Sequence, residues 1–232
     1  DNTRNSFVDL EESWAVGAYA MLSQDCQTHM LAIDYDVSIR RLSDCKQILS
    51  IDGKQDSLRQ AIMTPDGNRL IYCCDGPIKV WNISENYEEN CLEIYSAHRI
   101  ALSKNGKRLA ASSSNGIFVW NMETRREEAK FPALKNRANC LIFTSDDACV
   151  VVSEEKGEIK AFDIEENKEI SSFRAVSPSI MIHRPTTGQI LIGEKKGAIG
   201  VWNLLSGRKD FSLQGPSKAV VSLDISSDGS RL

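Results

Sequence analysis

The side chains that could do chemistry in this chain are three histidines and seven cysteines, and their spacing favours no catalytic or metal site. His29, His98 and His183 lie far apart in the sequence. Cys26 and His29 have the two-residue gap that zinc ligands use, but no second pair completes four ligands. The phosphate-binding glycine loop, the serine-nucleophile motif, the zinc-protease motif and the calcium loop are all absent from the sequence. We therefore expect no catalytic residue, no metal, no cofactor and no small-molecule ligand.

Composition narrows the class of protein further. The formal net charge of −4 provides no basic field for nucleic acid, and no apolar run is long enough to span a membrane. The seven cysteines are an odd number without a C-x-x-C pair, and we predict small buried side chains in a reducing, cytoplasmic compartment. The chain begins at Asp1 and not at Met, so we expect a fragment of a larger protein, whose targeting signal this sequence would not show.

The sequence contains an internal repeat. Four similar stretches end in an aromatic residue followed by Asn or Asp and then an apolar residue, and a fifth is weaker: DGPIKVWNI (75–83), NGIFVWNM (115–122), KGEIKAFDI (156–164), KGAIGVWNL (196–204) and DVSIRRLSD (36–44). The marker residue of each stretch recurs every 39 to 42 residues, at Leu42, Trp81, Trp120, Phe162 and Trp202. A fixed period of this length is typical of a repeat architecture.

A second marker holds the same period. Turn-like stretches such as TPDGNRL (64–70) and SKNGKRL (103–109) each precede an apolar run, and their fourth residues are Gly67, Gly106, Asp147, Gly188 and Gly229, with Cys26 as a weaker sixth copy. Two independent markers with one period indicate a true repeat.

Each repeat is predicted to form four short strands. In the third repeat we expect strands near 97–103, 108–114, 116–121 and 127–133, with no helix longer than two turns anywhere in 58–213. Continuous apolar runs such as Val150-Val151-Val152 suit strands that are buried on both faces. The predicted fold class is all-β, a β-propeller of four-stranded antiparallel blades, with blades near 14–52, 57–96, 97–133, 138–174 and 177–213 and a partial sixth at 219–232.

These stretches resemble the WD-repeat (WD40) family, in which the third strand of each blade ends in Trp-Asp and the first turn reads Ser-Pro-Asp-Gly. The resemblance covers the chain from Trp14 to Leu232 and implies a propeller without intrinsic activity that docks other proteins. Asn replaces Asp after all three repeat tryptophans, and the Gly-His pair before the first strand is missing. We therefore expect these blades to lack the family's His–Ser/Thr–Asp–Trp hydrogen-bond network, so that apolar stacking between blades holds them together.

Other classes of protein stay open at this point. The stretch AFDIEENKEISSF (161–173) is similar to blades of quinoprotein enzymes at Ala161, Asp163 and Lys168, and Phe173 stands where those blades have Trp. A propeller can also gather residues from several blades at a channel mouth, which would allow another kind of enzyme. A purely architectural spacer is a further alternative, as is a sensor array behind a nucleotide-binding switch domain.

The loops offer a hypothesis about the partner. Loops that join consecutive repeats carry a basic excess, whereas runs such as Glu154-Glu155 and Glu165-Glu166 are expected in solvated turns. If an acidic partner binds there, four cations should contribute: Arg99, Lys135, Arg137 and Lys218.

The count of strands predicts an incomplete ring. The sixth repeat would supply a first strand near 219–225 and a turn at 227–229, while 6–10 could be a fourth strand. We expect these residues alone to form an open arc of a seven-bladed propeller, poorly soluble or self-associating through uncovered blade faces.

Overall fold

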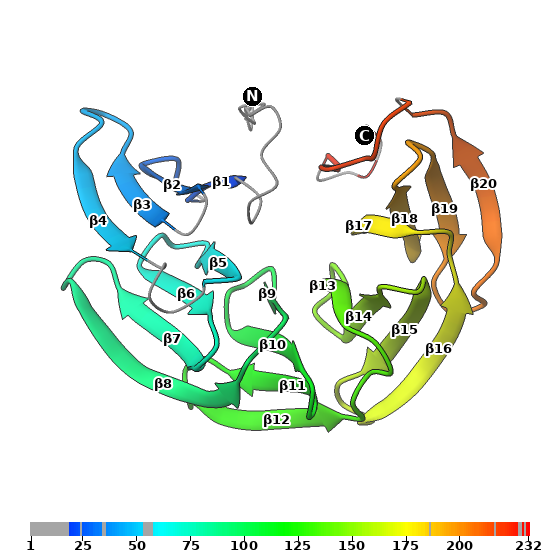
Figure 1. Ribbon diagram of the computed structural model, residues 1–232, viewed down its shortest axis with the longest axis horizontal. Helices are drawn as coiled ribbons and strands as arrows, with labels where there is room; N and C mark the ends of the chain where they lie inside the picture. The colour runs from blue at the N-terminus through cyan, green and yellow to red at the C-terminus, as the bar shows by residue number, and fades with distance from the viewer. Residues whose placement is uncertain are drawn as a thin grey trace. The chain divides into compact units, whose positions relative to one another are not determined.

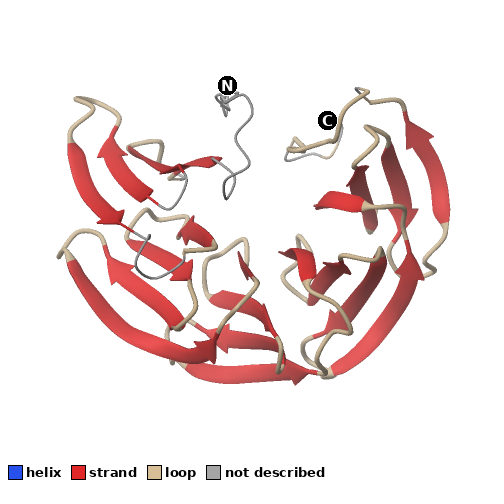
Figure 2. Ribbon diagram, viewed as in Figure 1, coloured by secondary structure: helices blue, strands red, loops and turns tan. Residues whose placement is uncertain are grey.

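The computed structural model describes residues 19–23, 25–33, 36–52, 58–185, 187–215, 217–226, 229 and 231–232. The regular elements in this part of the chain are all strands, which confirms the predicted all-β class (Figure 2). Within the described ranges, no helix is long and apolar enough to cross a bilayer. Trp14 and the 6–10 segment, which we expected in the first repeat and in a closing strand, lie outside the described residues.

The strands form five consecutive four-stranded antiparallel sheets, and the chain divides into two compact units, up to Ala97 and from His98. Unit 1 holds two sheets. The first consists of β1 (Tyr19–Leu22), β2 (Thr28–Ile33), β3 (Asp36–Arg41) and β4 (Gln47–Asp52). The second consists of β5 (Gln60–Met63), β6 (Arg69–Cys73), β7 (Pro77–Asn82) and β8 (Tyr87–Tyr95).

Unit 2 holds the other three sheets (Figure 1). The third sheet consists of β9 (Arg99–Leu102), β10 (Arg108–Ser113), β11 (Gly116–Asn121) and β12 (Arg126–Phe131). The fourth consists of β13 (Ala138–Phe143), β14 (Cys149–Glu154), β15 (Glu158–Asp163) and β16 (Lys168–Arg174). The fifth consists of β17 (Pro178–Arg184), β18 (Gln189–Glu194), β19 (Ile199–Asn203) and β20 (Lys209–Leu213). The strands expected for the third repeat are thus confirmed to within two residues at each end.

Every sheet has the order of the chain, so each strand pairs with the next one along the sequence. In such a meander the turns between the first and second and between the third and fourth strands lie at one end of the sheet. The turn between the second and third strands and the links to neighbouring sheets lie at the opposite end. We call these the ab/cd end and the bc/da end. The arrangement is blade-like, as the repeat predicted.

Apolar side chains hold neighbouring sheets together within each unit. In unit 1, residues of the first sheet such as Met30 and Ile39 form one buried cluster with Leu70 of the second sheet. In unit 2, the ring of Phe131 stacks on that of Phe162 at 4.7 Å between centroids, joining the third and fourth sheets. Because both faces of a middle sheet are covered, Val150, Val151 and Val152 are all fully buried. The prediction that these apolar runs are buried on both faces is confirmed.

Left-handed backbone recurs at the position marked by the repeat. All six marker residues have φ between 54° and 71°. Five of them lie in turns between first and second strands, and the sixth lies in the sixth repeat: Cys26, Gly67, Gly106, Asp147 and Gly188, and then Gly229. Glycine reaches this region without a steric penalty, whereas Cys26 and Asp147 adopt it at a cost. The marker residue thus recurs in the sequence because each repeat needs positive φ at that position.

Asx residues fix the turns between the third and fourth strands. The side-chain Oδ1 of Asn82, Asn121, Asp163 and Asn203 accepts the backbone N–H of the residue three positions later, at 2.8 to 2.9 Å. A short Asx side chain can bond the nearby backbone in this way and so start a turn.

The sixth repeat departs from the prediction. Residues 219–225 form no strand, because a strand needs a neighbour and none of the described residues after Leu213 pairs with this segment. Val220 instead packs on the fifth sheet, where its N–H donates to the Glu194 carbonyl at 3.2 Å. Residues 227 and 228 of the expected turn lie outside the described residues, while Gly229 N–H donates to the Ser226 carbonyl at 2.8 Å.

The prediction of buried cysteines is wrong for two of the six cysteines whose burial is described. Cys73 and Cys74 are buried and Cys140 and Cys149 are partly buried, but Cys26 and Cys45 are exposed. Both exposed cysteines have positive φ and lie in turns between strands, outside the packed sheets.

Candidate functional site

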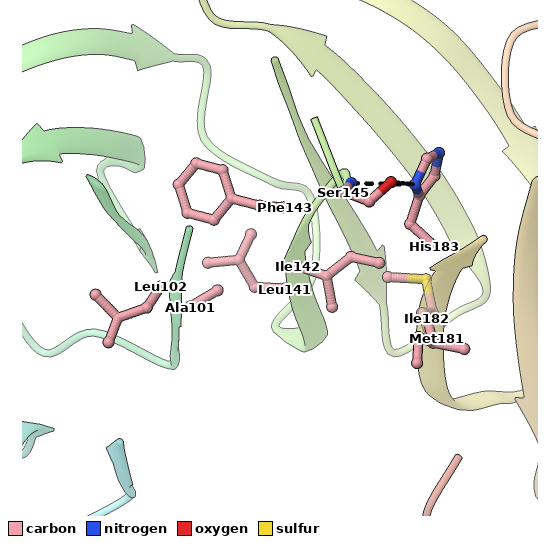
Figure 3. Close-up of a pocket in the computed structure, with 9 residues that line it drawn as sticks. All are labelled: Ala101, Leu102, Leu141, Ile142, Phe143, Ser145, Met181, Ile182 and His183. Atoms are coloured by element: carbon pink, nitrogen blue, oxygen red, sulfur yellow. Dashed lines mark hydrogen bonds between the residues drawn. The ribbon is translucent and has the colours of Figure 1, made fainter. Parts of the chain in front are cut away.

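A cavity of about 230 Å³ in unit 2 is the first candidate for a site. It lies where the first strands of three sheets run side by side, and it is lined by Ala101, Leu102, Leu141, Ile142, Phe143, Ser145, Met181, Ile182 and His183 (Figure 3). Seven of these nine side chains are aliphatic, aromatic or thioether groups. The polar chemistry of the cavity is confined to Ser145 and His183.

These two residues form a hydrogen-bonded pair that the sequence did not reveal. His183 Nδ1 lies 2.9 Å from Ser145 Oγ, and it also accepts the backbone N–H of Ser145 at 3.1 Å. Burial lowers the pKa of His183, while the nearby charge of Asp146 opposes that shift. The imidazole is therefore neutral at neutral pH, with its proton on Nε2.

A serine beside a histidine suggests nucleophilic catalysis, but the geometry does not complete such a site. The lone pair of Nδ1 already accepts a backbone N–H, so it is not free to take a proton from the hydroxyl. Among the described residues, no carboxylate accepts a hydrogen bond from Nε2 to orient the ring, as a catalytic triad requires. The pair instead joins the fourth sheet to the fifth.

Links of this kind recur at the ab/cd end of unit 2. Lys104 N–H donates to Asp147 Oδ1 at 2.8 Å between the third and fourth sheets, and Arg184 Nε donates to the Gly229 carbonyl at 2.9 Å beyond the fifth. The contact between Ser145 and His183 occupies the corresponding place between the fourth and fifth sheets. This periodicity identifies it as one member of a structural series.

Thiol chemistry is equally unfavourable in this region. Burial raises the pKa of the Cys140 thiol. Burial, with the carboxylates of Asp163 and Asp146, raises the pKa of Cys149 to about 11. Because the thiolate is the reactive form, neither cysteine is activated as a nucleophile.

A second series of links runs through the starts of the first strands, at the bc/da end. Arg59 Nη1 donates to the Ala97 carbonyl at 3.2 Å, and Arg99 Nε donates to the Asn139 carbonyl at 2.7 Å. Asn139 Nδ2 donates to the Pro178 carbonyl at 3.3 Å. A side chain at the start of one sheet thus caps a backbone carbonyl some 38 to 40 residues ahead, so each link joins equivalent places in consecutive repeats.

The bc/da end also contains a buried carboxylate. Glu154 is fully buried, and its Oε2 accepts the backbone N–H of Asn136 at 2.9 Å and its side-chain Nδ2 at 2.8 Å. Glu154 Oε1 has no hydrogen-bond partner among the described residues. The expectation of a solvated turn is wrong for Glu154, because the preceding loop folds over it, and correct for Glu155, which is exposed. Glu165 and Glu166 are exposed, as expected.

The four predicted partner-binding cations fall into three environments. Lys135 and Arg137 are exposed and flank Asn136 in the loop that Glu154 fixes. Arg99 is half-buried, and its guanidinium donates to the carbonyls of His98 and Asn139, so the structure gives it a role in joining sheets. Lys218 is exposed, beyond the fifth sheet. The loop carrying Lys135 and Arg137 is therefore the part of the predicted set that the structure brings together.

Other sequence candidates gain no ligand-like geometry. His29 Nδ1 is buried without a partner, while Cys26 is exposed, and no group of three potential metal ligands occurs within the described ranges. Phe173, in the stretch similar to quinoprotein blades, stacks on Trp202 at 5.2 Å and so packs the fourth sheet on the fifth.

The repeat tryptophans lack the hydrogen bonds of well-formed WD blades. The indole Nε1 atoms of Trp81, Trp120 and Trp202 are buried, and none of them has a partner in the described part of the chain. Trp81 and Trp202 instead pack against buried apolar clusters of their sheets.

The fold therefore defines a chain of blade-like antiparallel sheets, as in β-propeller proteins. The chain matches no protein-family model, and no curated protein is similar to it at a significant level.

Proposed function

We propose that this chain is a non-catalytic scaffold of the WD-repeat type, which binds other proteins through its loops as part of a larger protein. One observation supports this function above others: each repeat combines a turn of fixed backbone with exposed side chains that differ from repeat to repeat. The Asx residues and the hydroxyl groups of the turns supply the fixed part. Rigid loops with varied tips are suited to specific docking, because little conformational entropy is lost on binding.

The alternative of a propeller enzyme is favoured only by the cavity with Ser145 and His183. The hydrogen bond from the Ser145 backbone to His183 Nδ1 gives this pair a structural explanation. A hydrolytic or quinone-dependent reaction would need further converging groups with suitable protonation states. We therefore retain protein binding as the proposed function, and the cytoplasmic location stays a prediction.

Affinity capture from cell lysate, followed by mass spectrometry, tests the proposal. The full-length protein should recover at least one partner above a bead control, and that partner should bind the purified chain directly in calorimetry. Replacing Ser145 with Ala, and His183 with Asn, should leave capture intact if the folded state persists. Failure to recover any direct partner would count against the scaffold, and hydrolysis lost on Ser145→Ala would favour the enzyme.

A further inference from the structure

At the bc/da end of unit 2, turns and links of the fourth and fifth sheets are hydrogen-bonded to one another. Glu155 N–H donates to the Arg137 carbonyl at 3.0 Å, which attaches the turn after β14 to the link before β13. Arg174 donates to the Lys156 carbonyl at 3.2 to 3.3 Å, so the link after β16 lies against the same turn. Lys195 N–H donates to the Ser177 carbonyl at 3.1 Å, which carries the contact on to the fifth sheet.

Carboxylates that would balance this surface lie beneath it. Glu154 is fully buried under the loop that contains Asn136. Glu194, at the equivalent end of β18, is 8% exposed and lies 3.5 Å from Lys209 Nζ. Both side chains are therefore largely withdrawn from a molecule that lands on this end. Glu155 is exposed in these turns, and Glu158, at the start of β15, is partly exposed with its Oε1 at 3.8 Å from Lys160 Nζ.

The cations, in contrast, stay at the surface. We define the basic rim as six exposed side chains in the turns and links of the fourth and fifth sheets: Lys135, Arg137, Lys156, Arg174, Lys195 and Lys196. None of them forms an ion pair with another described residue, whereas cations nearer the other end, such as Lys107 and Arg108, pair with Glu123 and Glu128. Unpaired cations on hydrogen-bonded loops need little rearrangement to meet anions.

The surroundings favour a peptide over a nucleic acid. Val176 lies between Arg174 and Ser177 and is 61% exposed, so an apolar side chain stands among the cations. A phosphate backbone would gain nothing from that contact, whereas a peptide can place an apolar residue beside its acidic ones. The chain as a whole carries a formal charge of −4, which opposes attraction of a long polyanion.

We propose that the basic rim binds an acidic segment of a partner protein. Asp or Glu side chains would contact the six cations, and an apolar side chain would cover Val176. Glu154 is a positioning residue in this arrangement, because its carboxylate holds the backbone between Lys135 and Arg137. The inference rests on the proposed protein-binding function and names the chemistry of the partner.

Fluorescence anisotropy on the full chain tests the proposal with a labelled peptide of Glu and Asp residues around one Leu. Binding should weaken as NaCl rises from about 50 to about 300 mM, because screening shortens the range of the charges. Lys135→Glu with Arg137→Glu should weaken binding by about tenfold, mainly through slower association. A second pair, Lys195→Glu with Lys196→Glu, should act in the same direction, so the conclusion does not depend on one loop.

The matched control is Lys104→Glu with Arg208→Glu, which changes the net charge equally but on exposed residues of the ab/cd end. It should change affinity by less than about twofold. Equal losses in the control and rim variants would overturn the inference, as would single-stranded DNA of the same length binding more tightly than the peptide. A captured partner that binds both rim variants normally would also overturn the inference about the basic rim, but it would leave the proposed scaffold function intact. Failure to capture any partner would count against the scaffold function as well.

Discussion

Replacing Thr144 with Val should destabilise the fourth sheet by removing one buried hydroxyl group. Thr144 is 4% exposed and begins the turn between β13 and β14. Its Oγ1 donates to Asp146 Oδ1 at 2.5 Å and accepts the Cys149 backbone N–H at 3.0 Å. Valine has the same shape, so packing is kept while both hydrogen bonds are lost.

The magnitude follows from these two bonds. A hydrogen bond to a charged acceptor contributes about 1.5 to 3 kcal/mol and a neutral one about 0.5 to 1.5 kcal/mol. The extra methyl group of Val returns about 0.8 kcal/mol through burial. We expect Thr144→Val to lower the free energy of unfolding by about 2 kcal/mol. Urea denaturation followed by tryptophan fluorescence measures this change, and Thr124→Val, at an exposed position, is the control and should change it by less than about 0.5 kcal/mol.

The pH dependence provides a second check on the same bond. The Thr144 hydroxyl, above other causes, lowers the pKa of Asp146 below its ordinary value of 3.8. A carboxyl group with a lowered pKa stabilises the fold above its unfolded pKa, and this contribution is lost as pH falls through the folded value. The difference between wild type and Thr144→Val should therefore shrink below pH 3.8. An unchanged free energy of unfolding at neutral pH, or a difference that grows in acid, would refute the reasoning.

Three further predictions concern single side chains. Trp120→Phe should cost less than about 1 kcal/mol in urea denaturation, because the packing lost with the smaller ring is offset by removal of a buried indole N–H that has no partner among the described residues. A loss above about 2 kcal/mol would contradict this balance. Burial lowers the pKa of His183, so the unfolded chain takes up the proton first and the free energy of unfolding should fall as pH drops below 6.5. His183→Asn, which can still accept the Ser145 N–H, should make the free energy of unfolding depend less on pH in this range, and an unchanged pH dependence would contradict this origin. Gly188→Ala should destabilise the fold by about 1 kcal/mol through backbone strain alone, since Gly188 has φ +64° and an added Cβ would meet nothing within 4 Å. Cys26→Gly, at φ 54°, should relieve the same strain and raise the melting temperature, and effects of opposite sign would contradict this explanation.

The sequence was sufficient to predict the features that depend on local backbone conformation. The strands, their order and the positions of left-handed residues follow from the repeat, because each turn needs the same φ and the same side-chain acceptor in every copy. Asn82 and Asn121 illustrate this, since each bonds a backbone N–H only three residues away. The hydroxyl that opens the turn at Ser23, Thr64, Ser103 and Thr144 was equally regular in the sequence, and aligning the turns would have revealed it.

The tertiary structure decided which charged and polar groups remain available. Glu154 looked like a solvated turn residue and is fully buried, because a loop 18 positions away in the sequence folds over it. Arg99 looked like a loop cation open to a partner, and its guanidinium donates to a carbonyl 40 residues ahead. His183 and Ser145 lie in different repeats, and only the packing of their sheets brings them within 2.9 Å. Burial and pairing depend on groups that are distant along the chain, so a pattern of local propensities determines the blades without determining which of their side chains meet a partner.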